Sequence, residues 1–199
     1  MIPRNIQKLI ALSICLLAAP SARAIGLVSF GLKGGSTLSS QLSKDALGNS
    51  MGGYSYGVGF IVGGGVDIGI GAVGVMLDVL YAQRKVVYQV INAETSRSVH
   101  IPVLLRLKMG VARFEFGGYY ASAIGEIYNN GVPSSYASVN KTRADFGLTG
   151  GLALAVPVGV AKFTIEGRYN FGLENRNSAP TGLQSTHSSS FDLLAGFYF

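Results

Sequence analysis

The sequence has little of what disulfide-stabilised domains and metal sites require. Its 199 residues include one cysteine, two histidines and no tryptophan. One cysteine cannot form an internal disulfide, and two histidines without a cysteine cluster make a poor transition-metal site, so no cofactor is expected. Charged residues make up 13% of the chain, which is about half of the usual share for a soluble domain. This composition argues against a purely aqueous protein.

The chain also lacks a hydrophobic run long enough for a transmembrane helix, which needs about 20 residues. The longest candidate, residues 9–20, follows Arg4 and Lys8 and precedes Ala22 and Ala24. A basic head, a short apolar middle and small residues at the end are typical of a secretory signal peptide. We expect residues 1–24 to be a signal peptide cleaved after Ala24, which makes residues 25–199 the mature chain.

Cleavage at this point would remove Cys15 and three basic residues, so that the formal net charge falls from +6 to +3. No clustered lysine and arginine stripe remains in the mature chain, and nucleic acid is not expected as a partner. A lipoprotein modification of Cys15 is the alternative. It is disfavoured because the bulky Ile14 stands where a small residue is needed, and because the apolar run continues past the cysteine.

Apolar and polar residues alternate with a period of two through the mature chain, which predicts β-strands. In residues 73–84 the odd positions up to Tyr81 are apolar or aromatic, whereas Asp78 and Arg84 occupy even positions. Helical spacing would not separate the two kinds of residue in this way. The eight predicted strands are residues 27–35, 54–67, 73–84, 98–108, 112–123, 143–156, 160–171 and 186–199.

The connections between these strands alternate between long and short. Long connections are expected at residues 36–53, 85–97, 124–142 and 172–185, and short ones at 68–71, 109–111 and 157–159. Four long loops and three short turns place both ends of the mature chain at the short-turn end. The predicted fold class is all-β, an eight-stranded antiparallel up-and-down transmembrane β-barrel.

The two parities of each strand differ in chemistry. One carries Val, Leu, Ile, Phe and Tyr, which suits lipid, and the other carries glycine and charge, which suits the interior of a small barrel that side chains just fill. Eight basic and six acidic residues fall on the inward parity, and their near balance predicts a network of paired charges that plugs the lumen. A narrow gated ion path is the alternative. The predicted interior charges are Lys33, Asp67, Asp78, Arg84, Arg106, Lys108, Arg113, Glu115, Arg143, Asp145, Lys162, Glu166, Arg168 and Asp192.

The final strand alternates up to a terminal phenylalanine, a pattern that resembles the C-terminal signal recognised by the barrel-assembly machinery. The mature chain also resembles the small outer-membrane β-barrel family labelled porin-like or PorT-like, with eight-stranded barrels of the OmpA/OmpX type. The signal residues are Phe191, Leu193, Ala195, Phe197 and Phe199. The stretches that carry the family resemblance are residues 30–36, 77–81, 100–106, 145–151 and 166–173. The resemblance implies a fold and a bacterial outer-membrane location, but no catalytic set.

One pair of residues has a spacing associated with catalysis. His187 and Ser189 share the His-x-Ser spacing seen in outer-membrane lipid A deacylases, where the histidine acts as general base for the serine. No glutamate that could orient the histidine follows in the remaining residues. We therefore expect no catalytic residue and no enzymatic activity.

Together these patterns predict an integral outer-membrane protein with a structural or surface-interaction role and both mature termini in the periplasm. Its expected partners are outer-membrane lipids and, during biogenesis, the barrel-assembly machinery, and the protein is expected to be a monomer. A small-solute channel is the first alternative and a lipid-modifying enzyme the second.

Overall fold

The computed structural model describes residues 28–44, 55–88, 92–136, 142–174 and 185–199. The signal peptide predicted over residues 1–24 lies outside these residues. The strands are β1 (Val28–Lys44), β2 (Ser55–Ile70), β3 (Val73–Tyr88), β4 (Asn92–Met109), β5 (Ala112–Ala123), β6 (Ile127–Asn129), β7 (Val132–Ser134), β8 (Ala144–Val158), β9 (Ala161–Gly172) and β10 (Ser185–Tyr198). No helix in the described part of the chain is long and apolar enough to cross a membrane.

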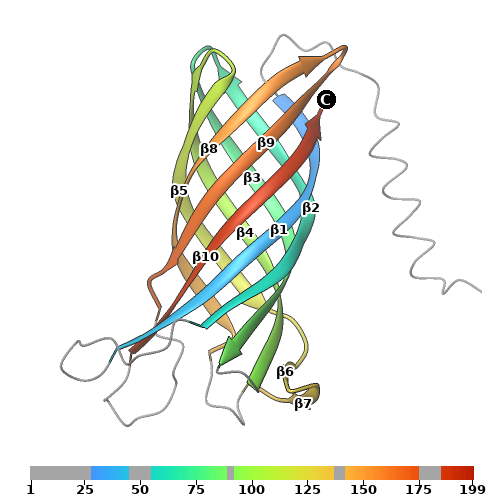
Figure 1. The fold of residues 1–199 in the computed structure, drawn as a ribbon. Helices are drawn as coiled ribbons and strands as arrows, with labels where there is room; N and C mark the ends of the chain where they lie inside the picture. The colour runs from blue at the N-terminus through green and yellow to red at the C-terminus, as the bar shows by residue number, and fades with distance from the viewer. Residues whose placement is uncertain (1–27, 45–54, 89–91, 137–141, 175–184) are drawn as a thin grey trace, which may run out of the picture.

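Eight long antiparallel strands close into a barrel, as Figure 1 shows. β3 pairs with β4 in addition to β2, and β1 pairs with β10 in a register that sets Gly31 opposite Tyr198. The backbones of Phe30 and Phe199 complete the seam with hydrogen bonds of 3.1 and 2.8 Å. The predicted eight-stranded antiparallel up-and-down topology is confirmed.

Three two-residue turns join the long strands at one end of the barrel. They connect β2 to β3, β4 to β5 and β8 to β9, and each begins with a glycine. Gly71, Gly110 and Gly159 have φ angles of 59°, 64° and 61°. Glycine at the first position of a two-residue hairpin is favoured because side chains disfavour positive φ there. The short turns therefore begin within three residues of their predicted places and end within one.

Two of the four long connections are shorter than the sequence indicated. β1 continues to Lys44, β3 continues to Tyr88, and β4 begins at Asn92, so half of the loop predicted at 36–53 and most of the loop predicted at 85–97 is strand. These extensions are rich in Ser, Thr, Gln and Asn and do not alternate in polarity. Backbone pairing does not require apolar side chains, so the ladder continues after the hydrophobic pattern has ended.

The third long connection contains a small hairpin that the sequence did not indicate. β6 and β7 pair with each other, and β6 adds to the outer part of β4, where Thr95 lies opposite Tyr128. Ile127, on β6, and Tyr136, two residues after β7, are fully buried. Figure 1 shows the hairpin at the end of the barrel opposite the short turns, which we call the long-loop end.

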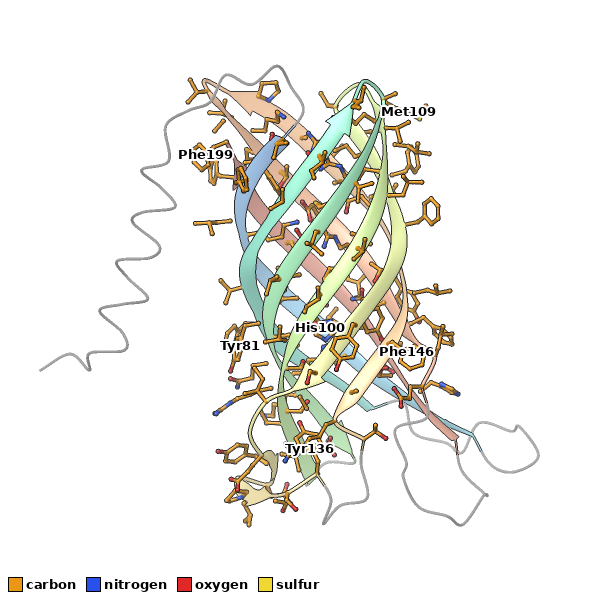
Figure 2. The ribbon with its side chains drawn as sticks, turned by 180° about the vertical axis from the view of Figure 1, so that it is seen from behind. Tyr81, His100, Met109, Tyr136, Phe146 and Phe199 are labelled. Carbon is orange, nitrogen blue, oxygen red and sulfur yellow. The ribbon has the colours of Figure 1, made fainter. Side chains whose placement is uncertain are left out.

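The outer surface of the barrel is apolar and aromatic over most of its height. Figure 2 shows side chains projecting outward along the barrel, with Phe199 and Met109 near the short-turn end and Tyr81 and Phe146 nearer the long-loop end. Inward positions alternate with these along every long strand. In water such a surface would be an aggregation site, whereas a lipid bilayer solvates it.

Glycine is needed at some inward positions because a side chain there would collide with the backbone of the neighbouring strand. A Cβ atom added to Gly63 would collide with the carbonyl oxygen of Val79 on the neighbouring strand, and Gly117 stands in the same relation to Val103. Gly150 faces outward and has open space around it. The strands are thus coiled tightly enough at these inward positions that only glycine fits without a backbone shift.

Candidate functional site

The centre of the barrel interior is occupied by an ion-pair network whose members come from four different strands. Lys33 Nζ lies 3.0 Å from Asp78 Oδ2 and 2.9 Å from Glu166 Oε2. Arg168 places its three nitrogens 2.7 Å from Asp78 Oδ2, 2.6 Å from Glu166 Oε2 and 3.1 Å from Glu115 Oε2. All five side chains are at most 2% exposed. We call these five residues the central network.

The central network bridges the lumen because β1, β3, β5 and β9 lie on different sides of the barrel. Apolar clusters lie beside it along the barrel axis. Ile61, Leu80, Ala82 and Leu194 form one cluster, toward the long-loop end, and Met76, Leu104 and Tyr198 form the other, toward the short-turn end. Ions are therefore held between two apolar layers, where the low dielectric strengthens their pairing.

The interior on the short-turn side of the central network is mainly basic. Arg106 is fully buried and forms an ion pair with Asp67, and its Nη1 lies 3.8 Å from the sulfur of Met76. Arg113 is also buried. Lys162, which is partly exposed, donates a hydrogen bond of 3.3 Å to Ser29 near the opening. Lys108 is also only partly exposed at this end.

A layer of hydrogen-bonded polar and charged side chains lies on the long-loop side of the central network. Asn170 donates hydrogen bonds of 2.6 Å to Asp192 and 3.0 Å to Ser190, and its side-chain oxygen accepts one of 2.8 Å from Thr149. Arg84 donates to the same Ser190 hydroxyl at 3.0 Å. This layer connects β3, β8, β9 and β10 across the lumen.

Asp145 lies at the inner edge of the mouth at the long-loop end. Its Oδ2 atom accepts hydrogen bonds from Ser188 at 2.5 Å and from Tyr119 at 3.3 Å. The ring of Tyr119 stacks on His100, with centroids 5.4 Å apart. Figure 2 shows His100 inside the barrel and Tyr136 beyond it at the long-loop end.

Of the fourteen residues predicted to face the interior, eleven are buried inside the barrel and two, Lys108 and Lys162, are partly exposed near the short-turn end. Arg143 is the exception. It precedes β8 and is exposed at the rim, with its guanidinium carbon 5.7 Å from the centre of the Tyr136 ring. The predicted strand began at Arg143, one residue too early, because alternation alone does not mark where the barrel wall ends.

Several interior residues were not predicted, because the predicted interior set contained only charged side chains. Asn170, Thr149, Tyr119 and Tyr198 lie on the same inward parity as the charges on their strands, so counting parity alone would have found them. Glu94 was missed for another reason. It is buried on β4, but the strand was predicted to begin at residue 98.

The residues considered for catalysis do not face the barrel interior. His187 and Ser189 occupy the outward parity of β10, and the His187 ring stacks on Phe171 with centroids 6.2 Å apart. Within the described ranges no group of three or more His, Cys, Asp or Glu side chains is arranged to hold a metal ion.

Comparison with solved structures identifies other small barrels. Neisserial surface protein A is 14% identical in sequence, with a TM-score of 0.51, and the match covers 84% of this chain and 95% of that protein. The attachment invasion locus protein Ail of Yersinia pestis is 12% identical, with a TM-score of 0.44 and coverages of 86% and 99%. No curated protein sequence matches the chain.

Comparison with protein families gives one match over most of the sequence. The model of the outer membrane protein beta-barrel domain matches residues 19–176. The match agrees with the closed barrel and its apolar outer surface, and it implies a location in the outer membrane. The chain therefore belongs to the outer membrane protein beta-barrel domain family.

Proposed function

We propose that this protein is a non-enzymatic outer-membrane barrel with a structural or surface-interaction role, whose lumen is closed by paired charges. One observation carries the proposal, namely that Arg168 contacts three carboxylates while Lys33 shares two of them. A conducting path along the axis would have to separate these ions. Leaving one buried ion without its partner costs about 3–5 kcal/mol, so the paired state dominates.

The apolar layers add to this barrier. An ion moving from the long-loop end would meet Ile61, Leu80 and Leu194, which are at most 2% exposed, before it reached the central network. The cluster on the long-loop side, unlike the one that contains Tyr198, has no side-chain oxygen that could replace water around a passing ion. The two kinds of barrier act in series.

The proposed orientation places the long-loop end outside the cell and the short turns in the periplasm. Bacterial barrels of this type have short periplasmic turns and longer external loops. β1 begins and β10 ends at the short-turn end, so both mature termini would be periplasmic (Figure 1). The long-loop end, including β6 and β7, would then be the surface available to the outside.

The proposed partners are lipids and, during biogenesis, the barrel-assembly machinery, and the proposed state is a monomer. The outward side chains of the last strand support the contact with lipid, since Phe191, Leu193, Phe197 and Phe199 are 44–61% exposed on the outer wall. Membrane fractionation followed by electrophoresis with and without boiling tests it. A folded monomeric barrel migrates faster before boiling, and the absence of a mobility shift would count against the proposal.

Conductance in planar bilayers tests the closed lumen. The mature protein, inserted from detergent, is expected to give no reproducible current steps at voltages where a large porin, run as the positive control, conducts. Ion-selective steps that recur between preparations would overturn the closed-lumen proposal and favour a small-solute channel.

A further inference from the structure

A basic pocket opens at the long-loop end of the barrel, and the closed-lumen proposal assigns it no role. Its lining includes Arg84, His100, Asp145, Arg143 and Tyr136, together with the hydroxyl residues Ser96 and Ser98 of β4. The pocket therefore brings together side chains from β3, β4 and β8 and from the segment after β7. It faces the water at the mouth, and the layers of the interior lie below it.

Arg84 is the fixed part of this pocket. It is 8% exposed, and its Nη2 atom donates to the hydroxyl of Ser190 at 3.0 Å. Its Nε atom is buried and has no hydrogen-bond acceptor among the residues that the structure describes. A buried charged donor without an acceptor is costly, and an anionic ligand in the pocket would remove that cost.

Arg143 forms the outer wall of the pocket. Its guanidinium lies over the Tyr136 ring with 5.7 Å between the guanidinium carbon and the ring centre. This cation–π contact positions the guanidinium without a hydrogen bond from its N–H groups to the ring. Tyr136 is itself 1% exposed, so the ring under Arg143 is packed into the mouth of the barrel.

The charge of the lining also favours an anion. Three arginines, Arg84, Arg97 and Arg143, stand against one carboxylate, that of Asp145. Arg97 contributes less than the others because it lies on the outward parity of β4, with its guanidinium carbon 5.2 Å from the centre of the Tyr128 ring. The Oδ2 atom of Asp145 is already bonded to Ser188 and Tyr119, which offsets part of its negative charge.

We propose that this pocket binds a phosphate or sulfate group of a ligand that reaches the mouth from the water. Arginine forks combined with serine hydroxyls are the donor set that such tetrahedral oxyanions prefer. Arg84 would hold the group from below through the positive charge of its guanidinium, and Arg143 would contact it from the rim. The group could be free in solution or be carried by a lipid headgroup, and both sources present the same oxygens.

The test uses the mature chain in detergent micelles, titrated with inorganic phosphate and with inorganic sulfate at constant ionic strength. Nuclear magnetic resonance follows the Nε–H signals of the arginines. We expect saturable shifts at Arg84 and Arg143. Because a hydrogen bond to a charged group is worth about 1.5–3 kcal/mol, Arg84→Gln and Arg143→Gln are each expected to weaken binding by about tenfold or more.

Lys85→Gln is the matched control. Lys85 neighbours Arg84 on β3 but is exposed on the opposite face, so this change removes the same charge without touching the pocket. Its affinity should stay within about twofold, since exposed charges contribute little. Arg143 is exposed, so Arg143→Gln is expected to fold even if Arg84→Gln does not, and the electrophoretic mobility shift checks each variant.

A parallel titration in nanodiscs containing a phosphorylated outer-membrane lipid separates the two sources. The reference is the same protein in nanodiscs without the phosphorylated lipid. Shifts of the Arg84 and Arg143 signals from this reference before phosphate is added would assign the site to the headgroup. Shifts only after phosphate is added would assign it to a soluble anion. Either result supports the site. Shifts that do not saturate, or equal weakening by Lys85→Gln and Arg143→Gln, would overturn it.

Discussion

Replacement of Arg168 by methionine is the sharpest test of the central network. Arg168 and Lys33 carry two positive charges against the three negative charges of Asp78, Glu115 and Glu166, which gives a net charge of −1. Arg168→Met removes one positive charge and makes the net charge of the network more negative, at −2. At an effective dielectric constant of about 20, each contact of 2.6–3.1 Å is worth about 5–6 kcal/mol of attraction.

Desolvation offsets most of that attraction, because the guanidinium and the carboxylates are removed from water. Removing one partner nevertheless leaves the other charges buried and unpaired, and we expect the free energy of unfolding to fall by about 3–5 kcal/mol. The assay is urea unfolding of the mature protein in lipid vesicles, with the slope of the transition checked for each variant. Lys85→Met is the control, and its loss should stay within about 0.5 kcal/mol.

A second variant separates charge from packing. In Glu166→Gln/Arg168→Met the net charge of the central network returns to −1, so part of the lost stability should be regained. Contacting residues commonly couple by about 0.5–3 kcal/mol in such a cycle. A loss below about 1 kcal/mol for Arg168→Met would refute the reasoning, since it would mean that water solvates the carboxylates well enough to replace the arginine.

Three further predictions concern the barrel wall and its assembly. Gly63→Ala should destabilise the barrel by about 1–3 kcal/mol in the same urea assay because its Cβ meets the backbone of the next strand, whereas Gly150→Ala should have no such cost. Leu152→Arg, at the middle of the lipid-facing side of β8, should cost about 2–4 kcal/mol, and Val158→Arg at the strand end about 0–1 kcal/mol; equal costs would contradict the membrane placement. Phe199→Ala, which keeps the backbone hydrogen bonds to Phe30, should reduce the folded protein recovered from outer membranes without slowing refolding in detergent, and a normal yield in cells would argue against the role of Phe199 as an assembly signal.

The sequence predicted the number of long strands, their order and the inward parity because these depend on local alternation. A period of two assigns Asp78 and Arg84 to one face of β3 whatever lies across the barrel. It also locates the short turns, because the alternation breaks off at each of them and resumes within a few residues. These features are encoded within a dozen neighbouring residues.

The pairing of the interior charges could not be predicted in the same way. Lys33 and Glu166 are 133 positions apart, and whether they lie at the same height depends on the tilt of the strands and on the stagger at which the barrel closes. Alternation gives neither quantity. The strand extensions and the β6–β7 hairpin escaped for a related reason, because polar segments carry no periodic signal even when their backbones pair.

The accessibility of the barrel centre tests the closed lumen most directly. Met76 is fully buried, and its sulfur lies 3.3 Å from the Tyr198 hydroxyl and 3.6 Å from Lys33 Nζ. The only cysteine of the chain is Cys15, so Met76→Cys introduces the single thiol of residues 25–199. Ser98→Cys, at the mouth, is the control.

A small water-soluble thiol reagent, added to the folded barrel in vesicles and detected by mass spectrometry, is the measurement. The closed lumen predicts that the cysteine at position 98 is modified, while the one at position 76 reacts only after the barrel is unfolded in urea. Modification of both positions at similar rates in the folded protein would show that water reaches the central network and would contradict the account.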